Sequence, residues 1–168
     1  HPDVFAEEGV SIRAVKRIYG ELSGNPDHGL DPKEIYEVAE GLHEGDADAA
    51  KGAFRQLGEV LGDTIATTIS IIDGLIVIGG GMTGAAKYIK PSIMEVMRSR
   101  IKTLDGKELG RIPMKVYDLD NEEEMAAFLK GEQQKIKIYD SEIEVDFGPQ
   151  KRIGVTVSKL GAGKAIAI

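Results

Sequence analysis

The 168-residue chain contains no cysteine, which excludes disulfide bonds and cysteine–zinc sites within it. Its three histidines, His1, His28 and His43, are far apart and lack the spacing of metal ligands. There is no excess of positive charge either: the net charge is −7, whereas surfaces that bind nucleic acid are usually basic. We therefore expect neither a metal site nor a nucleic-acid interface in this chain.

Long apolar runs are also missing. No segment is long enough to span a membrane and no signal peptide is visible, so we expect a cytoplasmic protein without a membrane segment. Hydrophobic residues make up 42% of the chain and charged residues 29%, a composition typical of one globular domain. The last residues are apolar and carry no helix stop signal, so we expect both ends to lie inside a longer protein.

Local signals predict several helices in the first half. Ser11 is the expected cap of one helix, and Asp31-Pro32-Lys33-Glu34 has the sequence of a capping box that begins the next. A long helix should then run to Asp73-Gly74. Its apolar stripe consists of Phe54, Leu57, Leu61, Ile65, Ile69 and Ile72. A further helix is predicted over residues 84–101, kinked or divided at Pro91.

Short apolar segments predict an α/β fold. Leu75-Ile76-Val77-Ile78 is apolar throughout, as in a strand covered on both faces, so we expect it at the centre of a parallel sheet with the long helix across it. Residues 114–117 and Arg152–Val157 are further strand candidates. Asn121 and Glu124 should form a capping box before a short acidic helix. Deep burial is expected for Leu61, Ile65, Ile76 and Ile78.

Alternating apolar and charged residues predict a hairpin after the acidic helix. Ile136 and Ile138 alternate with lysines, while Ile143, Val145 and Phe147 alternate with acidic residues. A lone two-stranded hairpin is marginal in water. Its apolar face should therefore pack on the domain or on another subunit.

The most informative stretch is the apolar strand followed by Gly79-Gly80-Gly81-Met82 and then a helix. Glycines admit unusual backbone dihedrals and remove the side chains that would block a ligand. Ligands of open α/β sheets bind beyond the carboxyl ends of strands, and a helix amino terminus favours anions such as phosphate. The turn is therefore a candidate binding site, although a tight turn without a ligand would use the same residues.

The context of this turn resembles the adenosine-binding segment of sugar kinases of the ROK (repressor, ORF, kinase) family. The resemblance covers about residues 54–102: a helix with Leu61-Gly62 near its middle, the apolar strand, the three glycines and the next helix. Val157–Gly163 is similar to the closing strand and leucine–glycine turn of the family, which precede a last helix.

The start of the chain resembles the family segment that ends in a sugar-binding glutamate. Glu7-Glu8-Gly9-Val10-Ser11 can be laid on that segment, which places Glu7 at the sugar glutamate; a solvated pair of charges before a helix is the other interpretation. Phe5 stands where the family has a zinc-binding cysteine, so no zinc is expected in this chain.

The resemblance implies an α/β fold of the ribonuclease H-like or actin-like ATPase type, with a mixed sheet flanked by helices. Residues 1–168 would then be the carboxy-terminal lobe of a sugar kinase, without its amino-terminal lobe. Residues 118–151 do not fit the family pattern and would be an insertion made of a helix and a hairpin.

The same resemblance implies a glucokinase-like enzyme that transfers the γ-phosphate of ATP, with Mg²⁺, to a hydroxyl of a hexose or modified hexose. Gly79, Gly80, Gly81 and Met82 would bind the nucleotide and Glu7 the sugar. The catalytic base would lie in the missing lobe, so this chain alone should be inactive, and a homodimer is expected. Two alternatives stay open: a sugar-responsive transcriptional regulator whose DNA-binding domain lies elsewhere, and a non-catalytic sugar-binding scaffold.

Overall fold

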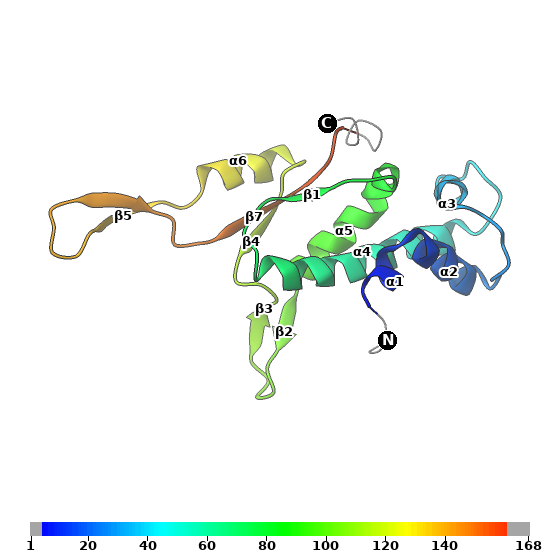
Figure 1. Cartoon of the computed structure of the whole chain (residues 1–168), viewed down its shortest axis with the longest axis horizontal. Coiled ribbons are helices and arrows are strands. Elements are labelled where there is room, and N and C mark those ends of the chain that lie inside the picture. The colour runs from blue at the N-terminus through cyan, green and yellow to red at the C-terminus, as the bar shows by residue number, and fades with distance from the viewer. Residues whose placement is uncertain (1–4, 161–168) are drawn as a thin grey trace.

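The computed structural model describes residues 5–160 and contains one helical layer and one small sheet, with two hairpins that project from them (Figure 1). The helices are α1 (Glu7–Val10), α2 (Ile12–Ser23), α3 (Pro32–Ala39), α4 (Ala47–Ile69), η1 (Thr83–Ala85, a 3₁₀ turn), α5 (Ala86–Arg98) and α6 (Glu122–Lys130). The strands are β1 (Ile76–Ile78), β2 (Arg100–Lys102), β3 (Glu108–Gly110), β4 (Lys115–Asp118), β5 (Gln134–Lys137), β6 (Glu144–Phe147) and β7 (Arg152–Val157). The predicted final helix lies outside the described residues.

The main sheet has three parallel strands in the order β1-β7-β4. The strand predicted at residues 152–157 is confirmed and occupies the centre, where Ile153 and Val155 are buried. The prediction that β1 is central is wrong for the described residues, because β7 is its only neighbour there. Val77 is 59% exposed, and Ile76 and Ile78 are half-buried instead of deeply buried. One face and one edge of β1 are therefore open within residues 5–160.

The helices pack around α4, which contacts α1, α2, α3 and α5. The largest fully buried side chains include Phe54, Ile35, Leu57, Ile93 and Val15. The backbones of α4 and α5 approach closely where α4 has glycine: a Cβ built on Gly58 would lie 2.4 Å from the carbonyl oxygen of Ile89. One built on Gly62 would lie 3.0 Å from the Cα of Ile93. Gly62, which was part of the resemblance to the ROK family, therefore allows the backbones of α4 and α5 to pack closely.

The predicted helix starts at Ser11 and Asp31 are confirmed. The Ser11 side chain accepts a hydrogen bond from the Ala14 amide at 3.3 Å and caps α2. Asp31 accepts from two amides of the first turn of α3, and the Glu34 side chain accepts from the Asp31 amide at 2.8 Å, which completes the capping box. Asp46 caps α4 in a similar way. Each side chain satisfies amides that lack partners at a helix start.

Two helix predictions are wrong in detail. The long helix α4 ends at Ile69 instead of near Asp73, and Ile72 is exposed. Leu61 and Ile65, within the helix, are half-buried instead of deeply buried. Of the two outcomes predicted for Pro91, a division of the helix is wrong, because α5 is continuous from Ala86 to Arg98, whereas a kink at Pro91 stays a prediction. An interior proline removes the hydrogen bond to the carbonyl four residues earlier, and its ring crowds that carbonyl. The packing of α5 on α4 stabilises the helix in spite of both effects.

The helix predicted over residues 84–101 also ends earlier than expected, because residues 100–110 form a hairpin. Strands β2 and β3 pair antiparallel, with Ile101 opposite Leu109. Their connection contains Gly106 in the left-handed region at φ +85°, and the Thr103 amide donates to the Lys107 carbonyl at 2.9 Å. The Asp105-Gly106 pair is a typical turn signal.

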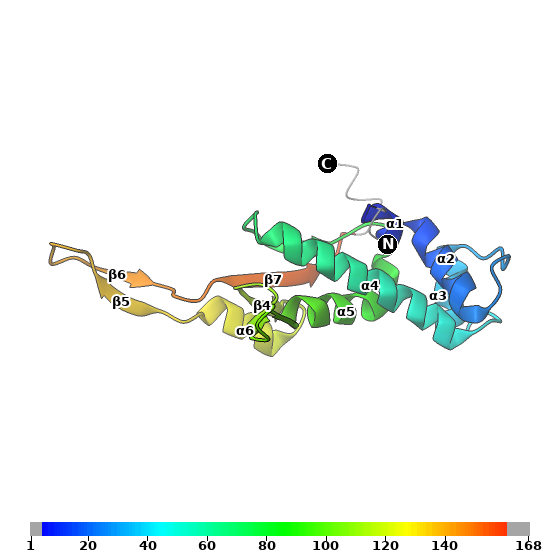
Figure 2. The ribbon, with the colours of Figure 1, turned by 90° about the horizontal axis from the view of Figure 1, so that it is seen from below.

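The segment after β4 forms α6 and then the hairpin β5–β6, which projects from the body (Figures 1 and 2). Asn121 caps α6, but Glu124 does not complete the predicted box: its carboxylate accepts from the Asp118 amide at 2.7 Å and pairs with Arg98. The predicted hairpin is confirmed, and Ile136 lies opposite Val145 in it. No residue of either strand is buried, so this apolar face does not pack on the described part of the domain.

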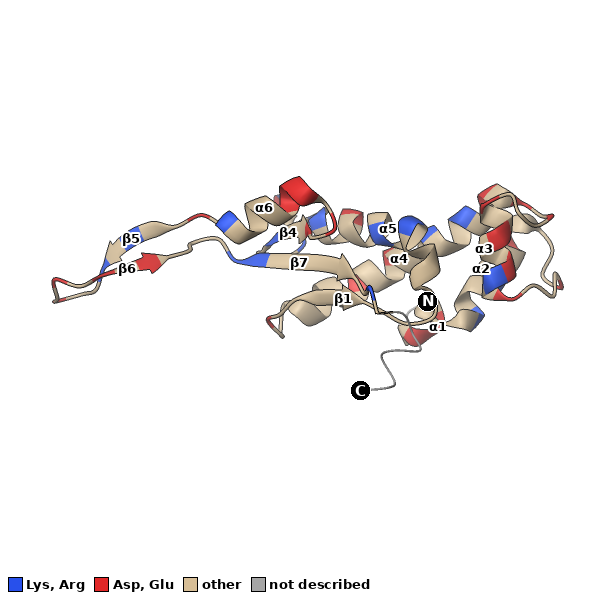
Figure 3. Cartoon of the chain, turned by 90° about the horizontal axis from the view of Figure 1, so that it is seen from above, with Lys and Arg blue, Asp and Glu red and all other residues tan. Residues whose placement is uncertain are grey.

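The charges of the hairpin lie on its other face. Lys135 pairs with Asp146 at 3.0 Å, and Lys137 with Glu142 at 2.7 Å. Basic residues are thus on β5 and acidic residues on β6, and the first turn of α6 adds an acidic patch (Figure 3).

Among the helices of residues 5–160, none is long and apolar enough to cross a bilayer.

Candidate functional site

The candidate site is the turn at the carboxyl end of β1. Hydrogen bonds fix this turn on both sides. The Ser158 amide donates to the Ile78 carbonyl at 2.8 Å and attaches the end of β1 to the end of β7. After the turn, the amide and hydroxyl of Thr83 both donate to the Gly80 carbonyl, at 3.2 and 2.9 Å. Only Gly80 has a left-handed backbone, with φ +99°, which disfavours other residue types.

The other two glycines have no packing reason within the described chain. A Cβ built on Gly81 would have no atom within 4 Å, and one built on Gly79 would meet the Ser158 side chain only at an ordinary 3.9 Å. Gly81 is exposed. At Gly79 and Gly81 the backbone is therefore bare although neither strain nor crowding requires glycine there, as expected for a surface that a ligand approaches closely.

A pocket of about 140 Å³ lies beside this turn. It is lined by Pro32, Lys33, Tyr36, Phe54, Gly81, Met82, Gly84 and Ala85, from the start of α3, from α4 and from the turn. The rings of Tyr36 and Phe54 meet edge to face, with centroids 6.4 Å apart. Complete small-molecule sites usually measure about 300–1,000 Å³, so this apolar pocket can hold only part of a ligand, such as a flat ring.

The structure brings the predicted nucleotide-binding residues together but leaves the predicted sugar-binding residue apart. Gly81 and Met82 line the pocket, and Gly79 and Gly80 precede them in the same turn. Glu7 is exposed in the first turn of α1 and does not line this pocket. Its neighbour Glu8 pairs with Arg13 at 2.6 Å.

Two of the histidines have local structural roles. The His28 ring contacts the Lys16 carbonyl at 3.0 Å and accepts from the Leu30 amide at 2.9 Å, while His43 contacts the Glu44 carbonyl at 2.9 Å. His1 lies outside the described residues. Within residues 5–160, no three histidine or acidic side chains are grouped so that they could hold a metal ion.

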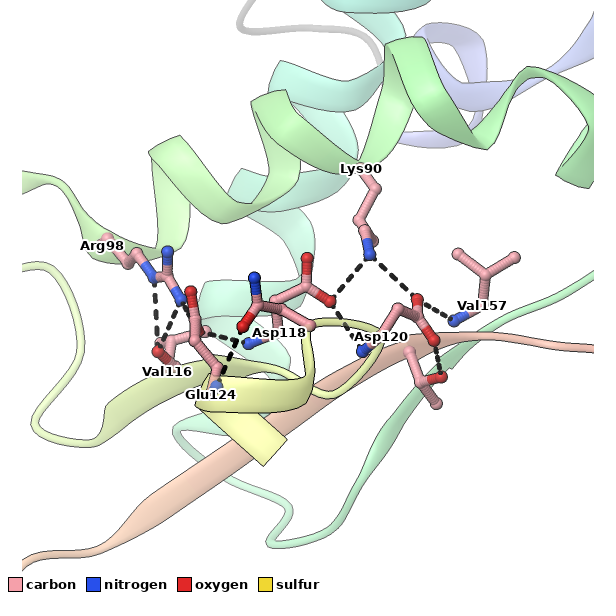
Figure 4. Close-up of polar contacts among 9 residues, drawn as sticks. Lys90, Arg98, Val116, Asp118, Asp120, Glu124 and Val157 are labelled. Carbon is pink, nitrogen blue, oxygen red and sulfur yellow. Dashed lines mark hydrogen bonds and ion pairs between the residues drawn. The ribbon is translucent and has the colours of Figure 1, made fainter. Parts of the chain in front are cut away.

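A partly exposed ion-pair network, drawn in Figure 4, lies at the same edge of the sheet as the turn. Lys90 of α5 contacts Asp118 at 2.7 Å and Asp120 at 2.9 Å. Asp120 also accepts from the Thr156 hydroxyl at 2.6 Å and from the Val157 amide at 3.0 Å. Because parallel strands end at one edge, β4, β7 and β1 bring this network and the turn to the same side.

The network raises the pKa of Lys90 and lowers the pKa of Asp120. Burial alone would lower the pKa of Lys90, but its hydrogen bonds to Asp118 and Asp120 outweigh burial and raise it. Burial alone would raise the pKa of Asp120, but hydrogen bonds from Thr156, Lys90 and the Val157 amide lower it. Lys90 and Asp120 are therefore both charged at neutral pH.

A family model matches two thirds of this chain. The model is that of the ROK family, and it matches residues 6–118. The chain belongs to the ROK family.

Among solved structures, this ROK chain is similar to a glucokinase from Parabacteroides distasonis, with 46% sequence identity and a TM-score of 0.85. The match covers 99% of this chain but 44% of the glucokinase chain, so the chain spans less than half of that protein. The fold is thus that of an actin-like ATPase lobe, as predicted. A comparison with curated proteins finds no match.

The family match ends where the predicted insertion begins. Residues after 118 lie outside the match to the ROK model, yet the glucokinase match extends over nearly the whole chain.

Sequence reasoning missed Lys90. The paired carboxylates Asp118 and Asp120 after a strand were a visible signal, but their cation comes from a helix 28 residues earlier.

Proposed function

We propose that the protein containing this ROK chain is an ATP-dependent sugar kinase, which transfers the γ-phosphate of ATP to a hydroxyl of a hexose or modified hexose. In this proposal the lobe supplies the adenosine side of the nucleotide site. The observation that carries the proposal is the turn Gly79–Gly81: its backbone is bare beside an apolar pocket, in a chain 46% identical to a glucokinase.

The residues of the pocket suit the base and ribose of a nucleotide. Tyr36, Phe54 and Met82 offer apolar and aromatic surface to a flat ring, while Gly80 and Gly81 admit a ligand close to the backbone. The turn leads into η1 and α5, and amides at a helix start favour the negative charge of phosphates. These residues would bind and orient the nucleotide and would carry out no chemical step.

Mg²⁺ would accompany ATP, since bound metal ions neutralise charge during phosphoryl transfer. The described carboxylates do not fit as its ligands. Asp118 and Asp120 lie at the correct edge of the sheet, but Lys90 bridges both. We therefore assign no metal contact to this chain, and place the catalytic base and the phosphate loops in the remainder of the protein. This lobe alone would be inactive.

We further propose that Glu7 contacts the sugar and that the protein is a homodimer. Glu7 is exposed at the start of α1, where a ligand from outside the lobe can reach it. For the dimer, the candidate surface is the apolar face of the β5–β6 hairpin, which the described domain does not cover. A second copy offers the same face and is the simplest partner, since most oligomers are symmetric.

Gly81→Val in the full-length protein tests the nucleotide site. Gly81 has neither positive φ nor a close neighbour, so the folded lobe accommodates a side chain there. We expect ATP to bind at least about tenfold more weakly by calorimetry, with sugar binding and melting temperature nearly unchanged. Gly80→Val is less informative, because its backbone strain would destabilise the turn as well.

Gly74→Val is the matched control, since Gly74 also has open space around its Cβ position and precedes β1 at the opposite end of the strand. It should bind ATP like the parent. If Gly81→Val also binds ATP like the parent, the nucleotide assignment is wrong. A parent protein that phosphorylates no sugar in a screen of sugars and nucleotides would instead favour the regulator or scaffold alternatives.

A further inference from the structure

We propose that Lys90 is a positioning residue for the nucleotide turn: it fixes α5 and the end of β7 relative to each other and thereby sets the position of Gly79–Gly81. This inference rests on the proposed kinase function. It adds a role for a residue outside the pocket, because Lys90 does not line the pocket that holds Gly81.

Lys90 links two parts of the lobe that are far apart in sequence. It lies in the second turn of α5, and its ammonium group contacts both Asp118 at the end of β4 and Asp120 just beyond it, at 2.7 and 2.9 Å. The Lys90 side chain is only 16% exposed. An ion pair in such a position is less screened by solvent than a surface pair, and it fixes the geometry of its partners.

A continuous series of contacts leads from Lys90 to the strand side of the turn. Asp120, held by Lys90, accepts from the Val157 amide at 3.0 Å. The next residue, Ser158, donates its amide to the Ile78 carbonyl at 2.8 Å, and Gly79 follows directly. The position of Gly79 thus depends on the end of β7, which Asp120 holds.

The helix side of the turn depends on Lys90 through α5 itself. The 3₁₀ turn η1 leads directly into α5, and the Thr83 amide within η1 donates to the Gly80 carbonyl at 3.2 Å. A shift of α5 therefore moves one side of the turn, and a shift of β7 moves the other. Lys90 is the side chain that joins the two through Asp120 (Figure 4).

Removal of the ammonium group should disturb this geometry more than the fold. Without Lys90, two carboxylates remain side by side and repel each other, so Asp120 would move away from Asp118 and loosen its contact with Val157. The core beneath α5, which includes Ile89 and Ile93, does not involve Lys90 and should persist. A misplacement of about 1 Å in a positioning group, caused by a distant mutation, can cost an enzyme about 100-fold.

Lys90→Met in the full-length protein provides the test. We expect the KM for ATP to rise roughly tenfold, while kcat and the KM for the sugar stay within about twofold of the parent values. Lys90→Arg keeps a cation between the carboxylates and should restore most of the ATP affinity. Asp120→Asn is a milder change of the same network. If Lys90→Met does not fold, the KM of Asp120→Asn for ATP provides the test instead.

Arg98→Met is the matched control. Arg98 lies on the same helix, donates to the Val116 carbonyl at 3.0 Å and pairs with Glu124, so it also joins α5 to β4 and α6. It is eight residues from Lys90, about 12 Å along the helix, at the end remote from the turn. A fall in melting temperature comparable to that of Lys90→Met, with the ATP KM unchanged, is the expected result.

The outcomes separate the two proposals. If the parent protein phosphorylates a sugar, but Lys90→Met and Asp120→Asn keep its ATP KM or change it no more than Arg98→Met does, the positioning role is refuted and the kinase proposal stands. If the parent protein has no kinase activity with any sugar, the proposed function fails first.

Discussion

The close approach of α4 and α5 makes Gly58→Ala a demanding test of the fold. In an exposed helix, alanine is favoured over glycine by about 1 kcal/mol. At Gly58, however, the new Cβ would lie 2.4 Å from the Ile89 carbonyl oxygen and 2.9 Å from the Ser92 Cβ. Comfortable contacts need about 3.5 Å, so the two helix backbones would have to separate by roughly 1 Å.

The magnitude follows from these opposing effects. Overpacking of a core typically costs about 1–3 kcal/mol, and the upper end applies here because the Ile89 contact is with rigid backbone. After the gain in helix propensity, we expect a net destabilisation of about 2 kcal/mol. For a domain of this size, that corresponds to a fall in melting temperature of about 5 °C, measured by circular dichroism.

Gly52→Ala on the same helix supplies the comparison. Its Cβ would meet only the tip of the Leu22 side chain, at 2.8 Å, and Leu22 is 45% exposed and free to rotate. This variant should be neutral or stabilised by up to about 1 kcal/mol. If Gly58→Ala were as stable as Gly52→Ala, the helices could not be as close as described, and the account of α4–α5 packing would be refuted.

Two further predictions concern acid stability and self-association. The pKa of Asp120 is lowered in the folded protein, so the stabilisation from its charged form is present above the ordinary pKa of 3.8 and is lost as pH falls through the folded pKa. Asp120→Asn should therefore lower the melting temperature at neutral pH and flatten the decline of the melting temperature below about pH 4. A variant with the same acid profile as the parent would contradict this. On the hairpin, Val145→Glu should weaken the proposed dimer at least about tenfold in sedimentation experiments, whereas Lys135→Ala on the charged face should not; identical behaviour of both variants would exclude the hairpin as the interface.

Features fixed by neighbouring residues could be predicted from the sequence. The caps at Ser11 and Asp31 depend on side chains that bond amides two or three residues away, and β7 follows from a local run of residues between turn signals. The glycine turn was recognised for the same reason, since residues 76–82 carry the whole pattern. In each case the cause and the effect lie within one short segment.

Features fixed by distant contacts could not be predicted. Glu124 has the spacing of a capping box with Asn121, but Arg98 and the Asp118 amide, held nearby by the fold, bind its carboxylate instead. The half-buried state of β1 depends on which strands flank it, which its apolar sequence does not reveal. In the sequence, Lys90 looks like any other lysine of a helix. Its role becomes visible only in the fold, which brings the ends of β4 and β7 next to it.

The strand order β1-β7-β4 also has a consequence for the time at which the site forms. Ile76 pairs with Val155, so β1 finds its described neighbour only after about half of the chain has followed it from the ribosome. The helices α2 to α5 can associate earlier, because their contacts are closer in sequence. Until β7 is synthesised, the edge of β1 that pairs with it would stay unpaired. An unpaired strand edge favours chaperone binding and misassembly, so we expect both to occur at β1. The bond from Ser158 to Ile78, and with it the finished turn, would be among the last parts of the lobe to form.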